Sequence, residues 1–279
     1  MLDFVTWMAD PAIFTIGARE IRWYGLAFAI GFAIGYWIVE QMWKKEQLPP
    51  AWIDSLLIYT MLGTVIGARL GHCLFYAPDY YLANPVEILK IWEGGLASHG
   101  GTLGIIIAVY YYSKRVSHKS MLWTFDKLVV PTGLVAAMIR LGNLMNHEIY
   151  GHPTELPWGF RFIENLHQWK AGAEPVFSLP SHPTQLYEAT CYLITFVVCL
   201  WLYFRKEAWK QEGLIFGIFM ILVFGSRFFV EFVKNDQEAF EAGMLLNMGQ
   251  LLSIPFVLLG CFCIWRAIRI HKSNNQIYS

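Results

Sequence analysis

Seven long apolar runs divide this chain, and they constrain its fold more than any other feature of the sequence. They lie at roughly 22–43, 52–76, 95–113, 122–146, 186–204, 213–233 and 248–266. A helix needs about 20 predominantly apolar residues to cross the hydrocarbon core of a bilayer. Since every backbone polar group there must be hydrogen-bonded within the protein, each run is expected to be a helix. The sequence therefore predicts an all-α, polytopic membrane protein with seven transmembrane helices.

The composition agrees with this class and excludes others. Only 15% of the 279 residues are charged, whereas soluble proteins have about 25%. The formal net charge of +0 excludes a broadly basic nucleic-acid-binding protein, so no nucleic-acid partner is expected. The five cysteines all lie in apolar runs without a CxxC pair, which favours buried small side chains over a disulfide framework or a metal site. No cofactor is indicated.

The connection at 147–185 is the only long one, and it is rich in proline and charged residues. We interpret residues 1–279 as a single integral membrane domain in which this loop forms an extramembrane cap. Residues 1–20 are mixed in character and are expected at the membrane surface.

The distribution of basic residues orients the bundle. Lys and Arg are concentrated in the first, third and fifth connections and in the tail: Lys44, Lys45, Lys114, Arg115, Lys119, Arg205, Lys206, Lys210, Arg266, Arg269 and Lys272. The positive-inside rule assigns these segments to the cytoplasm. The N-terminus is therefore expected outside and the C-terminus inside, with the loop 147–185 on the outer side.

Glycines at helix-packing spacing predict where helices approach each other closely. The pairs and triplets are Gly31 with Gly35, Gly63 with Gly67 and Gly71, Gly100 with Gly104, and Gly213 with Gly217.

Arg140 lies several residues inside a predicted span, where a guanidinium costs a few kcal/mol or more to bury. At about 100° per residue, Arg140, Asn143 and His147 would share one stripe of a helix, and Gly142 would face a neighbouring helix. The stripe indicates a polar site in the membrane. The alternative is a structural arginine capped by backbone carbonyls.

Polar residues from several predicted helices converge in the outer leaflet. They are Tyr24, Arg69, His99, Arg140, Asn143, the run from His182 to Glu188, Arg227 and Glu231. Three arginines at one depth suit an anion such as a lipid phosphate, which Arg can hold with two parallel hydrogen bonds. Arg227 and Glu231 are spaced i, i+4, so they can pair on one helix, and they could also do no more than neutralise each other. A histidine such as His99 can accept a proton near neutral pH, or it can be a satisfied core residue.

The inner leaflet shows no intramembrane charge of comparable weight. Asp54 and Asp126 lie near the inner ends of predicted helices and are expected in solvent. The run His147-Glu148-x-x-x-His152 resembles a zinc-binding helix, but its histidines are five apart and would not share a face, so no metal site is expected.

Taken together, these motifs resemble those of the bacterial phosphatidylglycerol–prolipoprotein diacylglyceryl transferases. The family signature appears as Arg140-x-Gly142-Asn143-x-x-Asn146-x-Glu148-x-x-Gly151. Further matches follow in the family's order: Trp23-Tyr24-Gly25, Gly67 to Gly71, Gly94 to Gly101, His182 to Glu188, Arg227-Phe228 with Glu231, and Met248-Gly249-Gln250. Ser181 and Lys234 depart from the family, which often has Arg at both places, and both are expected at the rim of the site.

The resemblance implies transfer of a diacylglyceryl group from phosphatidylglycerol to the lipobox cysteine of a prolipoprotein in the bacterial inner membrane. A thioether would form and glycerol phosphate would leave, without a metal or cofactor. The implied catalytic residues are His99, Arg140 and Arg227. The implied substrate-binding residues are Tyr24, Arg69, Asn143, Asn146, Glu148, Gly151 and Glu231.

The competing function is transport or flipping of a lipid or anion. Transporters bind substrate near the midplane, in broken helices related by internal repeats. The polar residues here lie toward one leaflet and no repeat is evident, which favours the enzyme.

Overall fold

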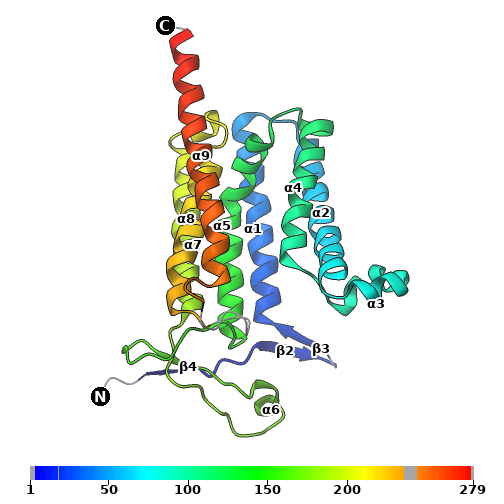
Figure 1. The fold of residues 1–279 in the computed structure, drawn as a ribbon, viewed down its shortest axis with the longest axis vertical. Coiled ribbons are helices and arrows are strands. Elements are labelled where there is room, and N and C mark those ends of the chain that lie inside the picture. The colour runs from blue at the N-terminus through cyan, green and yellow to red at the C-terminus, as the bar shows by residue number, and fades with distance from the viewer. Residues whose placement is uncertain (1–3, 18, 236–243, 278–279) are drawn as a thin grey trace. The chain divides into compact units, whose positions relative to one another are not determined.

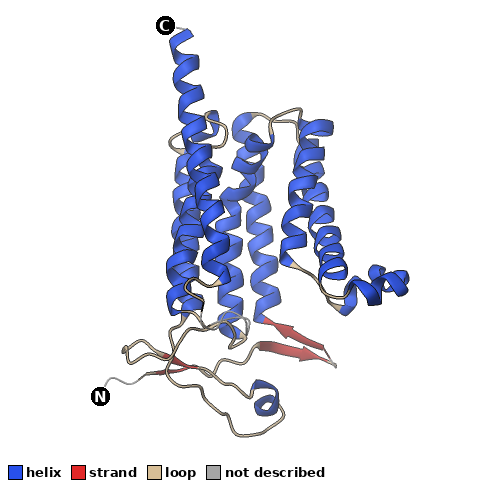
Figure 2. Ribbon diagram, in the orientation of Figure 1, coloured by secondary structure: helices blue, strands red, loops and turns tan. Residues whose placement is uncertain are grey.

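Helices dominate the computed structural model, which describes residues 4–17, 19–235 and 244–277 (Figures 1 and 2). The longer helices are α1 (Trp23–Glu46), α2 (Ala51–Phe75), α4 (Ser98–Tyr112), α5 (Met121–Met145), α7 (Thr184–Phe204), α8 (Leu214–Val230) and α9 (Met248–Ile277). The short helices are α3 (Pro78–Ala83) and α6 (Leu166–Lys170). Four short strands accompany them: β1 (Val5–Thr6), β2 (Ala12–Ile16), β3 (Arg19–Arg22) and β4 (Phe160–Arg161).

Among the described residues, 6 helices are long and apolar enough to cross a membrane. They span Trp23–Glu46, Ala51–Phe75, Met121–Met145, Thr184–Phe204, Leu214–Val233 and Met248–Ser273. Six of the predicted spans are thereby confirmed, five of them within three residues at each end, while the last extends seven residues beyond its predicted end at 266. The predicted span 95–113 corresponds to α4, which has 15 residues and continues into a π-helical turn, Ser113–Ser117. The chain is a polytopic, largely helical membrane protein.

The chain folds into two compact units, which are described separately. Unit 1 comprises residues 1–38 and 128–279, and unit 2 comprises residues 39–127. Both boundaries fall inside helices, one in α1 and one in α5.

Unit 2 is built on backbone contact between α2 and α4. A Cβ on Gly63 would lie 2.6 Å from the carbonyl oxygen of Gly104, and one on Gly71 would lie 2.7 Å from the Cα of Gly100. Only glycine permits this approach, so the predicted packing role of these glycines is confirmed.

Unit 1 uses the same device in two places. A Cβ on Gly35 would meet the ring of Pro131 in α5 at 3.3 Å, as its predicted packing role requires. A Cβ on Gly217 in α8 would lie 2.7 Å from the carbonyl oxygen of Gly260 in α9, and a Cβ on Gly260 would lie 2.7 Å from that of Gly217. The predicted pairing of Gly213 with Gly217 on one packing face is wrong, because Gly213 precedes α8 with a left-handed φ of 90°.

Buried charge lies at helix ends in unit 2, which contradicts the expectation that Asp126 lies in solvent, whereas Asp54 is exposed as expected. Lys127 is fully buried, 3.0 Å from a carboxylate oxygen of Glu46 and 3.8 Å from the centre of the Trp123 ring. Asp126 is also buried rather than solvated. The Trp123 ring lies one turn from Lys127 on the same helix, whereas the Glu46 carboxylate comes from another helix, which residue spacing could not predict.

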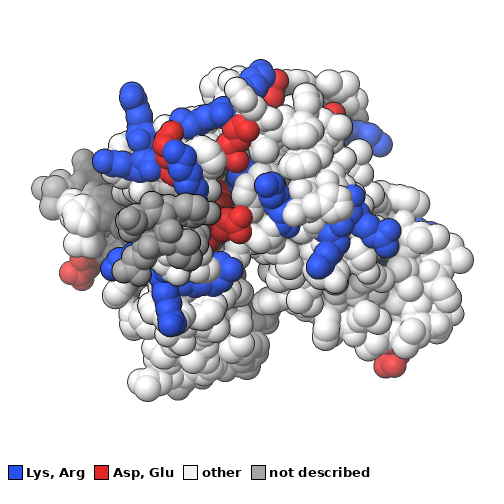
Figure 3. All heavy atoms as spheres, turned by 90° about the horizontal axis from the view of Figure 1, so that it is seen from above, with Lys and Arg blue, Asp and Glu red and all other residues white. Residues whose placement is uncertain are grey.

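Exposed basic side chains mark one end of each unit, viewed from above in Figure 3. In unit 2 they are Lys44, Lys45, Lys114, Arg115 and Lys119, and in unit 1 they are Arg205, Lys206, Lys210, Arg269 and Lys272. The orientation predicted from the positive-inside rule rests on these same residues.

The segment 147–183 covers the end of unit 1 opposite the C-terminus (Figure 1). Its strand β4 pairs in parallel with β1 near the N-terminus, and β2 and β3 form an antiparallel hairpin. His147 joins the pieces, since its Nε2 donates to the carbonyl of Ala9 at 2.9 Å and its Nδ1 accepts from the amide of Ile163 at 3.1 Å. The predicted stripe is therefore wrong for His147, because α5 ends at Met145 and His147 has a left-handed φ of 56°.

We expect acid to loosen this junction. Burial lowers the pKa of His147, and the bond to Ala9 only partly offsets this effect. Because the unfolded state takes up the proton first, stability is retained above the ordinary histidine pKa of about 6.5 and lost as pH falls below it. Hydrogen exchange of the Ile163 amide, corrected for its intrinsic rate, should be faster at about pH 5 than at about pH 7.5.

His147→Asn is the matched control. Its amide oxygen can still accept the Ile163 N–H, and it does not titrate. An acid effect that persists in this variant would assign the loosening to another group.

Candidate functional site

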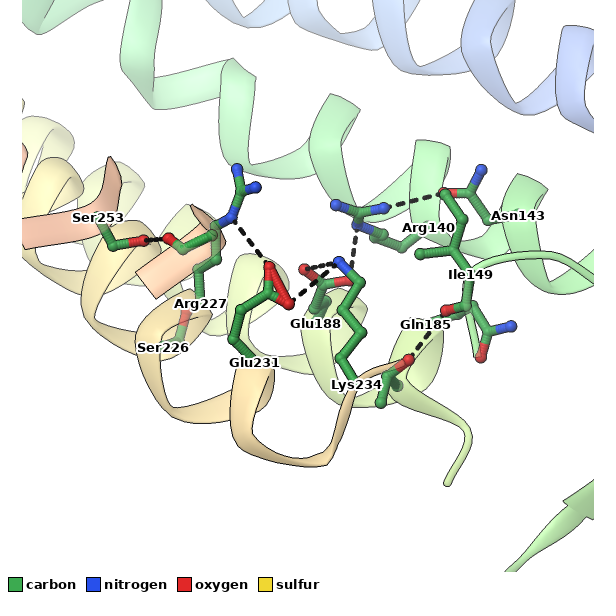
Figure 4. A network of polar contacts seen from close by, with 12 residues as sticks. Arg140, Asn143, Ile149, Gln185, Glu188, Ser226, Arg227, Glu231, Lys234 and Ser253 are labelled. Atoms are coloured by element: carbon green, nitrogen blue, oxygen red, sulfur yellow. Dashed lines mark hydrogen bonds and ion pairs between the residues drawn. The ribbon is translucent and has the colours of Figure 1, made fainter. Parts of the chain in front are cut away.

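Five alternating charges from three parts of unit 1 form a continuous network (Figure 4). Arg140 of α5 contacts Glu188 of α7, with 2.9 Å between Nε and Oε2. Arg227 of α8 contacts Glu231, with 3.6 Å between Nε and Oε1. Lys234 lies 3.7 Å from the remaining oxygen of each glutamate. The i, i+4 pairing predicted for Arg227 and Glu231 is confirmed, but the pair belongs to a larger network.

Exposure is graded across this network. The side chains of Glu188, Lys234 and Glu231 are 1%, 3% and 4% exposed. Those of Arg140 and Arg227 are 17% and 35% exposed. The two carboxylates and the lysine are thus buried, and the two arginine side chains are the accessible part of the network.

Each arginine uses its Nε edge to contact a glutamate. One terminal nitrogen of Arg140 also donates to Asn143 at 3.2 Å. The terminal nitrogens of Arg227 point away from Glu231 in Figure 4, and no carboxylate among the described residues contacts them. A guanidinium held by one edge can present the rest of its planar fork to an anion.

Beyond the charge network, a chain of hydrogen bonds extends from Arg140 to the loop that follows α5, and we call this chain the second arm. Asn143 donates to Oε1 of Glu148 at 2.8 Å, and Asn146 donates to the same oxygen at 3.1 Å. Glu148 is exposed. Of the predicted site residues, Asn143 therefore contacts Arg140 directly, Glu148 is linked to it through Asn143, and Asn146 through Glu148.

The start of α7 holds this loop in place through its backbone. Thr184 donates to the carbonyl of Ile149 at 2.9 Å, and the fully buried Gln185 donates to that of Glu148 at 2.7 Å. Buried amides must find partners, so these contacts fix the loop geometry. The run from His182 to Glu188 therefore acts as an anchor as well as supplying a carboxylate.

Gly151 and Tyr24 occupy positions set by close packing. A Cβ on Gly151 would overlap the carbonyl oxygen of Val233, and the Gly151 amide donates to His182 at 2.9 Å. Tyr24 lies in the first turn of α1, and a Cβ on Gly142 would be 2.5 Å from its ring. The predicted role of Gly142 in close approach of a helix is confirmed.

The remaining predicted site residues, Arg69 and His99, belong to unit 2. Arg69 is buried and donates to the backbone carbonyls of Glu87, Ile88, Gly94 and Gly95. Its guanidinium therefore holds the glycine turn that precedes α4, where Gly94 and Gly95 have left-handed φ values of 90° and 68°. His99 lies in the first turn of α4 and is exposed.

Glu188, Tyr192 and Lys234 contribute to this site but were not among the predicted site residues. Glu188 lay inside a quoted motif, and a carboxylate within a predicted span was itself a signal. Tyr192, one turn later, donates to Glu188 at 3.3 Å. Lys234 and Ser181 were expected at the rim, but both are buried, so that expectation is wrong. Ser181 exchanges backbone hydrogen bonds with Phe160, and Lys234 bridges the two glutamates.

Gly249→Ala should disturb the network without touching a charged residue. A Cβ on Gly249 would lie 2.5 Å from the carboxyl carbon of Glu231, so the carboxylate that contacts Arg227 must shift. We expect activity to fall by about tenfold to a hundredfold, because a 1 Å misplacement can cost about 10²-fold. Gly225→Ala in α8 is the matched control, since a Cβ there meets nothing within 4 Å. Equal activity of the two variants, measured as initial rates at equal folded concentration, would contradict this role for Glu231.

The profile of the prolipoprotein diacylglyceryl transferase family matches residues 11–266. The chain is 54% identical over 272 residues to the phosphatidylglycerol–prolipoprotein diacylglyceryl transferase of Porphyromonas gingivalis, covering 95% of each chain. It is 46% identical over 254 residues to the Tolumonas auensis enzyme of that name, covering 91% of this chain and 94% of the relative. The corresponding figure for Chloroherpeton thalassium is 43% over 267 residues, with 96% of each chain covered. Together with the membrane-spanning helices, these bacterial relatives identify a multi-pass inner-membrane protein.

Proposed function

Because this chain belongs to the prolipoprotein diacylglyceryl transferase family and is therefore a transferase, we propose that it moves the diacylglyceryl group of phosphatidylglycerol to the lipobox cysteine of prolipoproteins. The cysteine sulfur forms a bond to the carbon of the diacylglyceryl group that carries the phosphate. The carbon–oxygen bond to that phosphate breaks, and glycerol phosphate leaves with the bonding electrons. The thiol proton passes to a base.

The observation that carries this proposal is the pair of guanidinium groups, each held at its Nε edge by a buried glutamate. Negative charge grows on the phosphate oxygens as the leaving group departs. Donors already oriented toward that charge stabilise the transition state without having to reorganise. Arg140 and Arg227 therefore bind the phosphate and stabilise the departing glycerol phosphate.

The neighbouring polar residues suit the rest of the headgroup. Glu148 is exposed and bonded to Asn143 and Asn146, so its second oxygen can accept from a headgroup hydroxyl. Tyr24 and Gly151 shape the same unit, and Glu231 orients Arg227. We assign these residues to substrate binding, directly or through the loop that they support.

Arg69 and His99 take different roles in the proposal. The backbone bonds of Arg69 favour a positioning role, in which it holds the turn before α4 and so supports substrate binding indirectly. His99 follows that turn, and we propose it as the proton acceptor for the thiol. A neutral imidazole near a thiol can generate the reactive thiolate.

We further propose that α4 with its π-helical extension is a seventh span, and that both units form one membrane domain with the loop 147–185 as an outer cap. Residues 98–117 together approach the length that a span needs. The N-terminus would then be outside and the C-terminus cytoplasmic.

Single cysteines introduced at exposed positions test this orientation. Cysteines at Lys119 and Lys206 should react with an impermeant thiol reagent only after permeabilisation, and one at Glu164 should react in intact cells. The unmodified chain measures the background from the native cysteines. Labelling of Lys119→Cys in intact cells would contradict the orientation.

Family membership leaves the transporter alternative without support. The decisive assay mixes the purified full-length protein with phosphatidylglycerol vesicles and a lipobox peptide. The expected products are a diacylglyceryl thioether peptide and glycerol phosphate in equal amounts. A peptide with serine in place of the cysteine should release no glycerol phosphate. Lipid consumption without thioether formation would contradict the proposed function.

A further inference from the structure

We propose that Lys234 is a positioning residue that sets the placement of both phosphate-binding arginines through Glu188 and Glu231. The inference rests on the proposed function, because it concerns how the guanidinium groups of Arg140 and Arg227 are presented to phosphate.

The two glutamates divide their oxygens in the same way. Glu188 uses Oε2 for Arg140 and Oε1 for Lys234, and Glu231 uses Oε1 for Arg227 and Oε2 for Lys234. Within the described ranges, Lys234 is the one cation in contact with both carboxylates. The ammonium group therefore links two ion pairs that lie on different helices.

Burial strengthens the ionic contacts of Lys234 with the two glutamates. The side chains of Lys234 and both glutamates are nearly inaccessible, so solvent screens their interactions little. Burial lowers the pKa of Lys234, whereas Glu188 and Glu231 raise it. The ammonium form thus depends on both carboxylates being in place.

The backbone fixes Lys234 to the loop that carries the second arm. Lys234 forms an antiparallel bridge with Gly151, and the amide of His152 donates to Val233 at 2.9 Å. The end of α8 and the loop after α5 are therefore joined where the lysine enters the network.

Loss of the ammonium group has a definite consequence. Each carboxylate would keep an oxygen with no cation beside it, although Tyr192 would still donate to that oxygen of Glu188. The cation left in contact with each carboxylate would then be its own arginine. A glutamate that turned toward the terminal nitrogens of its arginine would compete with phosphate for the guanidinium fork. Lys234 keeps the carboxylates on the Nε edges and so leaves the forks open to substrate.

Lys234→Met removes the charge and retains much of the length, and Lys234→Arg retains the charge. For Met we expect the kcat/KM for phosphatidylglycerol to fall about tenfold to a hundredfold, mainly through KM, with Arg within about threefold of wild type. The affinity for glycerol phosphate, measured by calorimetry on the full-length protein, should fall by a similar factor. Lys210→Met, which removes an exposed lysine from a surface ion pair, should change neither quantity.

A double-mutant cycle separates positioning from general stability. Once Lys234→Met has misplaced the fork, the further loss from Arg140→Lys should be smaller than in wild type. Additive losses, or wild-type values of kcat/KM and glycerol phosphate affinity in Lys234→Met, would overturn the inference. If Lys234→Met does not fold, Lys234→Gln takes its place under the same criteria.

The calorimetric measurement also keeps this inference distinct from the proposed function. If wild type made no thioether, the proposed function would fail. A loss of glycerol phosphate affinity in Lys234→Met, restored in Lys234→Arg, would still support the positioning role.

Discussion

Arg140→Lys is expected to lower the rate of diacylglyceryl transfer by about 10²–10³-fold, the usual cost of losing one oriented donor to a developing oxyanion. Arg140 contacts Glu188 through Nε and Asn143 through a terminal nitrogen, and both contacts leave part of its fork for phosphate. A lysine carries a single ammonium group and cannot span Glu188 and phosphate with planar, paired donors.

The variant should still insert and fold. Its positive charge can remain beside Glu188, so no buried carboxylate is left without a cation. Initial rates with phosphatidylglycerol vesicles and a lipobox peptide provide the measurement. Arg19→Lys, an exposed substitution in the β2–β3 hairpin, is the matched control. Turnover at the wild-type rate in Arg140→Lys would show that paired hydrogen bonding by this residue is not required.

His99→Gln is expected to lower the rate by about 10²–10⁴-fold, the usual contribution of a general base. The glutamine is polar and uncharged but cannot take up a proton. If the imidazole accepts the thiol proton, wild-type activity should rise with pH along an acid limb, and the variant should lose that limb. Phosphatidylglycerol binding should change little.

Alkaline pH supplies an independent check on His99. As pH approaches the ordinary thiol pKa of about 8.5, solvent supplies thiolate and the variant should partly recover. His118→Asn, at another exposed histidine of unit 2, should retain the wild-type profile. An identical acid limb in His99→Gln and wild type would show that His99 is not the general base but a structural residue. Thiol activation would then be assigned to the arginines.

The length of the apolar runs determined most of the architecture. Five predicted spans agree with the structure within three residues at each end, because the bilayer imposes a fixed helix length and full backbone hydrogen bonding. The sixth begins at the predicted residue and continues to Ser273. Glycine spacing likewise predicted the contact of α2 with α4, since close backbone approach requires missing side chains over successive turns. Gly213 had the same spacing but serves a turn, which depends on φ rather than on sequence interval.

The identity of the residues around Arg140 was readable from the sequence, but their connections were not. Residue spacing predicted the contact of Arg227 with Glu231 because both lie about one turn apart on the same helix. It could not predict that Glu188 contacts Arg140 or Lys234, since these contacts cross between helices, whereas Glu231 and Lys234 are only three residues apart. His147 left the predicted stripe because the helix ends two residues earlier. The apolar runs thus determined which polar residues lie within the membrane. Only tertiary packing decided which charges meet and which atoms remain open to substrate.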